Sequence, residues 1–286
     1  MTPAPRTVTV FTRRAPGDTE AAVRRLVELA EESQITVRVP EEEVAKHELR
    51  DLPGAELGAD PDGPTDLAVV MGGDGTILTA MRRFAGRDVP VFAINFGAIG
   101  FLATVERDGL DDAIKQALAG QFDVLHLPAL AVGTSSGEYL AVNDISFHRR
   151  QDLRVAELGY SVMGAELGEV RCDGLVAATP AGSTGYNLAN GGPVMAWGVQ
   201  GFVVSFIAPH TLTARALVVA PDDALTVLNL SDRDEVRVGT DGRPVMSLPP
   251  GEATSVSFAQ EQVLLAQIPG STFYHRFRDK FGRLAY

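Results

Sequence analysis

The amino-acid sequence predicts an N-terminal α/β domain with a mainly parallel sheet, a mostly antiparallel β domain after it, and a C-terminal helix that packs back on the body. Two observations predict this fold class. Strand-like and helix-like segments alternate over the first 120 residues, whereas short alternating runs separated by Gly, Ser, Asp and Pro dominate from about residue 122. A chain of 286 residues also suits two domains at roughly 150 residues each. We expect the α/β domain over 1–120, the β domain over 121–270 and the helical tail over 271–286.

The first expected elements are a strand, a helix and a second strand. TVTVFT at residues 7–12 and ITVRV at residues 35–39 are strand-like. Between them, Asp18 can cap a helix. The helix is indicated by four apolar residues at helical spacing, Ala22, Leu26, Leu29 and Ala30.

The second part of the α/β domain contains two apolar runs and a helix. LAVVM at residues 67–71 and VPVFAIN at residues 89–95 are of the kind seen in strands buried on both faces. A helix from about residue 108 to 119 follows. This alternation predicts a layered α/β domain with a mainly parallel sheet.

Residues 41–66 are expected to form a solvated, irregular connection. They hold nine acidic residues against Lys46 and Arg50, a local balance of −7, together with the Gly and Pro of LPG and PDGP. The whole chain has a formal net charge of −12, so more than half of it falls in this segment, away from every candidate site. An acidic chain disfavours nucleic acid and anionic membrane as partners, because both are bound mainly by cationic groups.

Two hairpins open the β domain. FDVLHLPALAV and YLAVNDISFH flank TSSGE, and VAELGYSVM pairs with ELGEVR around a glycine. Further strand candidates are FVVSFI, ALTVLNL, EVRVG, TSVSF and QVLLAQI. In the tail, helical spacing places Tyr274, Phe277, Phe281 and Leu284 on one face, which we expect to dock on the body.

Composition excludes several classes of protein. With 45% hydrophobic and 22% charged residues, the chain is neither disordered nor of low complexity. Its single cysteine, Cys172, excludes an intrachain disulfide framework and is expected to be a buried small hydrophobe. The five histidines lack metal-ligand spacing. No apolar run has the length of a signal peptide or membrane span, and we expect a cytoplasmic protein.

A glycine-rich loop follows the apolar run at 67–71. It consists of Gly72, Gly73, Asp74, Gly75 and Thr76. Glycines at a strand-to-helix turn let the backbone approach a ligand, and the helix offers unpaired N–H groups to phosphate. A carboxylate repels phosphate unless it takes a proton or holds a metal ion, which points to phosphoryl transfer with Asp74 as base or Mg²⁺ partner. A simple tight turn is the alternative.

A second candidate group spans residues 173–193. Asp173-Gly174-Leu175 leads into a strand, followed by TPAGSTGY and, further on, GGP. Ser183 and Thr184 can cap the next helix, and Tyr186 adds an aromatic wall with a hydrogen-bonding tip. An ordinary Gly-Pro loop with a satisfied cap is the alternative.

Two further turns follow apolar strands. Asn143 can read a base or amide through its paired donor and acceptor, and Asp144 can accept from sugar hydroxyls. A strand-end turn is the alternative. NFGAIGFL at residues 95–102 can shape the crevice beyond the strand ends where ligands of open α/β sheets bind.

Together these segments resemble the NAD kinase family. The resemblance rests on GGDGT, the following N-x-G-x-x-G-F-L, an Asn-Asp form of the family's Asn-acidic pair, and DGL followed by TP-x-GST-x-Y and GGP. PHTLTAR and FRDKFGRL are similar to two later family motifs, so the match spans about residues 67–284 in the family's order. Diacylglycerol and sphingosine kinases and some phosphofructokinases share GGDGT, but TP-x-GST-x-Y with the Asn-acidic pair separates this family from them.

The resemblance implies an α/β domain, an NAD-binding β domain and an active site in the crevice between them. It implies transfer of the γ-phosphate of ATP to the 2'-hydroxyl of the adenosine ribose of NAD, with Mg²⁺ or another divalent cation that has no fixed protein ligands. Polyphosphate stays open as a donor. The implied partners are NAD and ATP, with neither nucleic acid nor membrane, and the implied assembly is a homodimer or homotetramer.

The resemblance also assigns residues by position. Asp74 is the expected base, and Gly72, Gly73, Gly75 and Thr76 form the expected phosphate loop. The expected NAD-binding residues are Asp74, Gly75, Asn143, Asp144, Arg154, Arg171, Asp173, Thr184, Gly185, Tyr186, Asn187, Ala189 and Arg243. An acidic residue that accepts a hydrogen bond from the ribose 2'-hydroxyl is known from dinucleotide-binding folds, and in-line delivery of phosphate turns that bond into proton removal.

Four positions depart from the family's pattern: Gly185, Ala189, Ala216 and Arg243 stand where Ala, Ser, Pro and Gln are frequent. The loss of Ser at 189 removes one expected hydrogen bond to NAD, and Arg243 can reach a phosphate instead. None of the departures touches Asp74.

Two other functions remain open from the sequence. A soluble lipid kinase is motivated by GGDGT, but it has to meet a membrane, and only the C-terminal helix offers a basic amphipathic segment. A non-catalytic NAD or NADP sensor would keep the binding residues and lack turnover. The intact Asp74 favours the kinase over the sensor.

Overall fold

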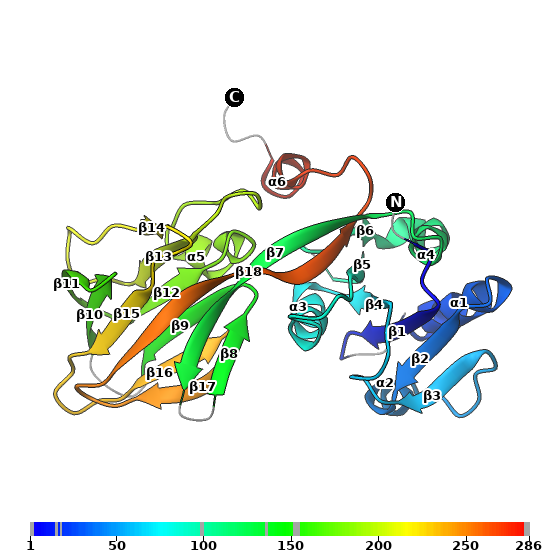
Figure 1. Ribbon diagram of the computed structural model, residues 1–286, viewed down its shortest axis with the longest axis horizontal. Coiled ribbons are helices and arrows are strands. Elements are labelled where there is room, and N and C mark those ends of the chain that lie inside the picture. Colours follow the sequence, from blue (N-terminus) through cyan, green and yellow to red (C-terminus); the bar gives the residue numbers. More distant parts are fainter. Residues whose placement is uncertain are drawn as a thin grey trace. The chain divides into compact units, whose positions relative to one another are not determined.

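The computed structural model describes residues 3–14, 17, 19–97, 100–134, 137–150 and 155–282. The chain divides into two compact units, the first formed by residues 1–126 and 263–286 and the second by residues 127–262 (Figure 1). The first is an α/β unit with a parallel sheet, the second is built of antiparallel strands, and a helix follows the last strand. The predicted fold class is confirmed.

The first unit contains six short strands and four α-helices, besides the C-terminal segment. The strands are β1 (Thr7–Thr12), β2 (Thr36–Pro40), β3 (Ala55–Ala59), β4 (Leu67–Gly72), β5 (Val91–Asn95) and β6 (Val105–Glu106). The helices are α1 (Thr19–Glu32), α2 (Glu41–His47), α3 (Asp74–Arg83) and α4 (Leu110–Leu118), the last preceded by the 3₁₀ turn η1 (Arg107–Gly109). The order β3-β2-β1-β4-β5 is parallel throughout, so β1, β4 and β5 end at the same edge.

Both faces of this sheet are covered. Val8 and Val10 of β1 belong to a core that also includes residues of α1 and α4. The opposite face of β1 is covered by α3. Phe11 of β1 makes an edge-to-face contact with Phe84 at the end of this helix, at 5.9 Å between ring centroids. Every residue of β4 is buried as a result. This explains why the central strands are continuous apolar runs.

The expectation for residues 41–66 was wrong, because this segment contains α2 and β3. Glu43 is buried, and its carboxylate accepts hydrogen bonds from Lys46 Nζ (2.6 Å) and Thr12 Oγ1 (2.5 Å). β3 pairs in parallel with β2 and alternates exposed and half-buried residues along its length. Local acidity and the Gly and Pro residues concealed both elements, since Thr12, one partner of Glu43, and the neighbouring strand of β3 lie outside this segment.

The second unit contains two antiparallel layers around one core. One layer has the order β14-β13-β12-β9-β16-β17, and the other contains β11, β10, β15, the first part of β18, and β7 with β8. The bounds are β7 (Asp123–Thr134), β8 (Gly137–Ala141), β9 (Asp144–Arg149), β10 (Ala156–Val162), β11 (Ala165–Cys172), β12 (Gly174–Ala178), β13 (Phe202–Ile207), β14 (Leu217–Val219), β15 (Leu225–Asn229), β16 (Val236–Thr240), β17 (Arg243–Leu248) and β18 (Ala253–Gln267). Side chains of both layers, Cys172 among them, form the core.

The predicted hairpin of VAELGYSVM and ELGEVR is present. The other predicted hairpin was wrong in its second arm, because YLAVNDISFH divides into β8 and β9, which belong to different sheets. β7 pairs with β8, and β10 pairs with β11 through the turn Met163-Gly164, whose two φ angles are positive. TSVSF and QVLLAQI are parts of one strand, the 15-residue β18, which pairs with β15 near its start and with β5 near its end. Because no turn signal separates the two apolar runs, the continuous strand is consistent with the sequence.

The C-terminal helix α6 (Phe273–Phe281) belongs to the first unit. Thr272 caps it by accepting a hydrogen bond from the His275 N–H (3.2 Å). The helix packs its phenylalanines against Phe101, so the predicted docking is confirmed. The predicted apolar face was wrong in one residue, because Tyr274 is 71% exposed and Phe273 takes its place. Leu284 lies outside the described residues.

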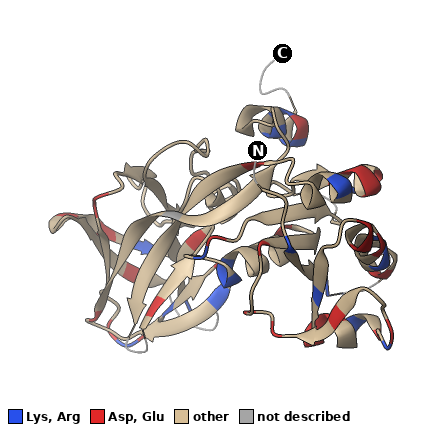
Figure 2. Ribbon diagram, turned by 45° about the vertical axis from the view of Figure 1, so that its right-hand side comes forward, with Lys and Arg blue, Asp and Glu red and all other residues tan. Residues whose placement is uncertain are grey.

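Basic and acidic residues are both present on α6, which carries Arg276, Arg278, Asp279 and Lys280 (Figure 2). Among the described residues, no helix has the length and apolarity needed to cross a membrane.

Candidate active site

The GGDGT loop joins β4 to α3. Gly73 is the N-cap of α3, and its carbonyl accepts from the N–H groups of Thr76 (2.9 Å) and Ile77 (3.1 Å). A Cβ on Gly72 would lie 2.6 Å from Thr76 Oγ1, so only glycine fits where the chain turns over the threonine. The loop therefore presents the start of a 10-residue helix, whose first N–H groups are suited to bind phosphate.

A second glycine loop lies against the first, because β4 and β5 are neighbours that end at the same edge. The Phe96 N–H donates to the carbonyl of Gly72 (3.0 Å), and a Cβ on Gly97 would lie 3.1 Å from the α-carbon of Gly73. Asn95 Oδ1 accepts from the Gly97 N–H at 2.9 Å. The two segments singled out in the sequence, GGDGT and NFGAIGFL, thus form one structural unit. Ala98 and Ile99 lie outside the described residues.

The Asp74 carboxylate is held by the second loop. It accepts hydrogen bonds from the backbone N–H groups of Phe101 (2.9 Å) and Leu102 (3.2 Å). A Cβ on Gly100 would lie 2.8 Å from Asp74 Oδ1, so the carboxylate rests over this glycine. Burial raises the pKa of Asp74, whereas the two N–H donors and the positive charges of Lys280 and Arg276 act against that rise.

A polar network borders this site. Asn95 Nδ2 donates to Glu106 Oε2 (2.7 Å), and Lys280 Nζ lies 2.9 Å from Glu106 Oε1. Burial alone would favour the neutral form of Glu106, but the hydrogen bonds from Lys280 and Asn95 lower its pKa. Arg13 Nη1 donates to the Phe96 carbonyl at 2.9 Å. The sequence interpretation did not name Glu106, Arg13 or Lys280 as site residues, and only the FRDKFGRL motif pointed to the last of them.

In the second unit, Asn143 lies between β8 and β9, and Asp144 is the first residue of β9. The carboxylate of Asp241 accepts from the N–H groups of Val142 (3.1 Å), Asn143 (2.7 Å) and Asp144 (3.2 Å). Asp241 has a φ of +46° in the turn between β16 and β17. The sequence interpretation missed this residue, although the Asp-Gly pair in the turn was a signal for it. Asp241 fixes the backbone from which the predicted pair projects.

The carboxyl group of Asp144 has an unfavourable environment for charge. It is 7% exposed, and burial together with the negative charge of Asp241 raises its pKa to about 7. Asn143 is half-buried, and its Oδ1 atom is buried without a hydrogen-bond partner among the described residues. Both side chains are therefore suited to gain hydrogen bonds from a ligand.

The segment after β12 packs tightly on this pair. Thr179 Oγ1 donates to the Val142 carbonyl (2.7 Å), and the Thr179 N–H donates to the Asn143 carbonyl (2.9 Å). A Cβ on Gly182 would overlap the backbone of Asn143. TP-x-G and the Asn-Asp pair are thus two sides of one contact, which explains why a threonine and a glycine are needed at this spacing.

The helix-capping role predicted for Ser183 and Thr184 was wrong. Gly185 is the N-cap of α5 (Tyr186–Ala189), without a side-chain cap, and Thr184 Oγ1 donates to Ala181 O (3.2 Å) in the 3₁₀ turn η2 (Gly182–Thr184). The Ser183 hydroxyl instead donates to Pro180 O (2.7 Å) and accepts from Met195 N–H (2.8 Å). The hydroxyl therefore joins the two ends of the loop. Its partner Met195 lies twelve residues away, so no local sequence signal indicates this contact.

Some of the other predicted residues of the second unit contact neighbouring side chains or backbone groups, and others are exposed. Tyr186 stacks on His148 at 5.6 Å, and Asp173 pairs with Arg149 at 2.6 Å. The Asn187 amide is buried and donates to Ser183 O and Pro193 O, both at 2.9 Å. The exposed predicted residues are Arg171, Gly185, Ala189 and Arg243. Arg154 lies outside the described residues.

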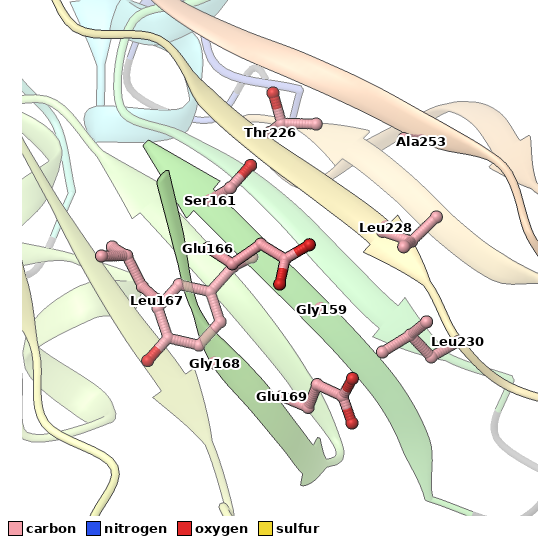
Figure 3. A pocket seen from close by; sticks show the side chains of 11 residues that line it. Gly159, Ser161, Glu166, Leu167, Gly168, Glu169, Thr226, Leu228, Leu230 and Ala253 are labelled. Atoms are coloured by element: carbon pink, nitrogen blue, oxygen red, sulfur yellow. The ribbon is translucent and has the colours of Figure 1, made fainter. Parts of the chain in front are cut away.

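A cavity on the second unit is lined by none of the site residues named above. It has a volume of about 430 Å³ and lies on β10, β11 and β15 (Figure 3). Its walls include Leu228 and Leu230 on one side, and Glu166 and Glu169 on the other. None of the residues predicted to bind NAD or phosphate lines it.

Comparisons with known proteins agree with these motifs. Residues 19–122 match the ATP-NAD kinase N-terminal domain, and residues 142–268 match the ATP-NAD kinase C-terminal domain. An NAD kinase of Gemmatimonas aurantiaca is 34% identical over 227 residues, which cover 77% of this chain and 78% of the relative. The chain belongs to the NAD kinase family. An NAD kinase of Thermomicrobium roseum is 34% identical over 260 residues, which cover 89% of this chain and 86% of the relative.

Two solved structures of NAD kinase relatives share the fold. Yeast NADH kinase, complexed with NADH, has a TM-score of 0.86 at 21% identity and covers 99% of this chain and 90% of its own. An NAD kinase from Archaeoglobus fulgidus, in complex with ATP, has a TM-score of 0.72 at 24% identity and covers 96% of this chain and 97% of its own. The family resemblance predicted from the motifs is confirmed.

Proposed function

We propose that this member of the NAD kinase family transfers the γ-phosphate of ATP to the 2'-hydroxyl of the adenosine ribose of NAD, with Asp74 as the base. The observation that carries this proposal is the setting of Asp74. Asp74 is the first residue of α3, and its carboxylate accepts hydrogen bonds from two backbone N–H groups of the neighbouring glycine loop. A carboxylate in a phosphate-binding loop is otherwise unfavourable.

The chemical step needs a proton acceptor at the attacking hydroxyl. The 2'-oxygen forms a bond to the γ-phosphorus, the bond from that phosphorus to the oxygen of ADP breaks, and the hydroxyl proton passes to the carboxylate of Asp74. Burial makes this carboxylate more basic than an exposed aspartate, and the N–H donors of Phe101 and Leu102 orient it. The glycine loop supplies N–H groups for the phosphate oxygens, with Gly72, Gly73, Gly75 and Thr76 as the proposed residues.

The second unit supplies the proposed NAD contacts. The carboxyl group of Asp144 and the buried amide oxygen of Asn143 are suited to the hydroxyl and amino groups of a nucleoside, because both gain hydrogen bonds there. Tyr186, stacked on His148, offers an aromatic face. The remaining contacts proposed from family position are Arg154, Arg171, Asp173, Thr184, Gly185, Asn187, Ala189 and Arg243.

A divalent cation fits the proposed reaction as part of the ATP complex. Among the described residues, no group of three or more His, Cys, Asp or Glu could hold a metal ion. Mg²⁺ keeps several waters and is commonly bound through phosphates and one or two carboxylates. The cation would then enter with ATP and neutralise charge on the phosphates. Asp74 is the carboxylate of the glycine loop that would contact it.

The proposal is tested with purified protein, NAD, ATP and Mg²⁺, coupled to an NADP-specific dehydrogenase. Because that dehydrogenase requires the 2'-phosphate, reduced product appears only if phosphate reaches this hydroxyl. Replacing ATP with polyphosphate decides the donor. Absence of product, with NAD binding seen by calorimetry, would favour the sensor. Phosphorylation of diacylglycerol in liposomes, with none of NAD, would favour the lipid kinase.

The proposed assembly is a homodimer or homotetramer, as family membership suggests. Light scattering after size-exclusion chromatography measures the mass directly, and a value equal to the monomer's 30.4 kDa would contradict it.

A further inference from the structure

We propose that Arg276 is a positioning residue for the reaction, because it fixes the peptide segment that holds the Asp74 carboxylate. The inference rests on the proposed role of Asp74 as base and adds a residue to that site. Arg276 lies on α6, and the segment consists of residues 100–103 of the same unit. The two are 175 residues apart in the sequence at Phe101.

The segment is held from two sides. On one side, the N–H groups of Phe101 and Leu102 donate to Asp74. On the other, the Arg276 guanidinium donates through Nη1 to the carbonyls of Phe101 (3.2 Å) and Ala103, and through Nη2 to Gln267 Oε1 (2.5 Å). Phe101 thus links the guanidinium to the carboxylate through its own peptide groups. A shift of the guanidinium shifts the donors of Asp74.

Packing directs Arg276 to this position. The Phe101 ring is 8% exposed and contacts the rings of Phe273, Phe277 and Phe281 at centroid distances of 5.9, 6.4 and 5.7 Å. Arg276 comes one residue before Phe277, so the aromatic contact brings its side chain over the same segment. The apolar contact anchors α6, and the guanidinium sets the orientation of the peptide groups.

A second set of bonds restrains the end of the segment. Thr104 Oγ1 accepts from the Ala93 N–H (3.0 Å) of β5 and donates to the Ala266 carbonyl (2.8 Å) of β18. The segment is therefore tied to the sheet at Thr104 and to Asp74 at its centre. Arg276 provides the contact from the remaining side.

Charge gives Arg276 a second effect on Asp74. The charged groups around this carboxylate are Arg276 and Lys280 of α6 and Glu106 of β6. Burial lowers the pKa of Arg276 to about 10, so its guanidinium stays cationic at neutral pH, and the charges of Asp74 and Glu106 favour that form. Arg276 and Lys280 in turn act against the burial-driven rise in the pKa of Asp74. Loss of either cation raises that pKa further.

The decisive experiment compares Arg276→Met, Arg276→Lys and Lys280→Met, with Arg278→Ala as control because Arg278 is exposed on the same helix. NADP formation is measured across pH 5–9. We expect Arg276→Met to lower kcat roughly 10- to 100-fold, because small displacements of catalytic groups have effects of this size. The KM for NAD should change less than threefold. The acid limb of its kcat profile should move to higher pH, since protonation of Asp74 then occurs at higher pH.

The other variants separate geometry from charge. Arg276→Lys keeps the cation but cannot donate to both carbonyls, so it should lower kcat without moving the acid limb. Lys280→Met should move the acid limb with a smaller loss of kcat, and Arg278→Ala should do neither. Circular dichroism and thermal unfolding accompany each variant. If Arg276→Met fails to fold, the two lysine variants, Arg276→Lys and Lys280→Met, still carry the test.

Unchanged kcat and pH profile in Arg276→Lys and Arg276→Met, with or without a lower melting temperature, would show that α6 is only structural. Asp74→Asn is measured in parallel. If Asp74→Asn loses turnover and the Arg276 variants do not, the positioning role fails and the base stands. If Asp74→Asn turns over normally, the assignment of the base itself is wrong.

Discussion

Burial raises the pKa of both Asp74 in the first unit and Asp144 in the second, although Asp74 is half-buried and Asp144 is buried. Their neighbours differ. Asp74 receives two backbone N–H bonds and lies in the field of two cations, which favour its ionised form. Asp144 has the negative charge of Asp241 beside it, and its pKa rises to about 7. Backbone donors and cations act against the effect of burial on Asp74, whereas a second carboxylate adds to the effect of burial on Asp144.

The difference agrees with the roles proposed for the two groups, a general base in Asp74 and a ligand-binding carboxyl group in Asp144. A general base must carry its charge before the substrate arrives, so its stabilisation has to come from the chain itself. A ligand-binding carboxylate can obtain its donors from the ligand. Hydroxyl donors of a bound ribose would lower the pKa of Asp144, so NAD binding near pH 7 should release protons. The two proposed roles thus differ in whether the chain itself already stabilises the charge of the carboxylate.

The largest expected effect separates the two aspartates kinetically. Asp74→Asn should lower kcat by roughly 10²- to 10⁴-fold, about 3–5 kcal/mol of barrier, with little change in NAD affinity. Asp144→Asn should instead raise the KM for NAD about 10- to 100-fold, as expected when one charged hydrogen bond is lost. Steady-state kinetics with both variants checks this. A similar loss of kcat in the two would remove the distinction.

The next effect is on stability. The pKa of Asp144 lies above its ordinary value of 3.8, so its contribution to stability is present at low pH and is lost as the pH rises from about 4 through 7. Asparagine has no charge to lose. The free energy of unfolding of Asp144→Asn relative to the native protein should therefore rise by about 2–3 kcal/mol between pH 5 and pH 8. Urea titrations measure it, with exposed Asp222→Asn as control. A difference independent of pH would contradict the prediction.

Substitution of two glycines, one beside Asp74 and one beside Asn143, tests whether the two sites have separate roles. A Cβ on Gly100 would meet Asp74, and a Cβ on Gly182 would meet the backbone of Asn143. Overpacking of this kind costs about 1–3 kcal/mol. Gly100→Ala should act on kcat and Gly182→Ala on the KM for NAD. Gly109→Ala and Gly198→Ala, whose Cβ atoms would have open space, are the matched controls. An effect of both variants on the same kinetic constant would count against separate roles.

The smallest effect concerns the support of the second site. Ser183→Ala removes the acceptor of the Met195 N–H, so we expect a loss of about 1–2 kcal/mol in the free energy of unfolding. Thermal unfolding measures the loss. Thr184→Val is the comparison, because its hydroxyl makes one longer bond, to Ala181 O at 3.2 Å. Equal losses in both variants would show that the contact with Met195 adds nothing.

The sequence allowed prediction of those elements whose reason is local. β4 and β5 were predicted because strands buried on both faces are apolar throughout, and β1 because TVTVFT is strand-like. GGDGT was recognised as a glycine-rich turn between a strand and a helix, and the reason for Gly72 is local, because its Cβ would meet Thr76. α2 and β3 were missed because their acidic residues are satisfied by distant partners such as Thr12. Asp241 and Arg276 were missed for the same reason, since each acts on backbone groups far away in the sequence.

The clamp on Phe101 also orders events during synthesis. A ribosome produces Asp74 and its two amide donors early, but the guanidinium that closes on the same peptide appears 175 residues after Phe101. By then the whole second unit has been translated. Until then the first unit lacks residues 263–286, and the peptide groups that hold Asp74 lack their contact with Arg276.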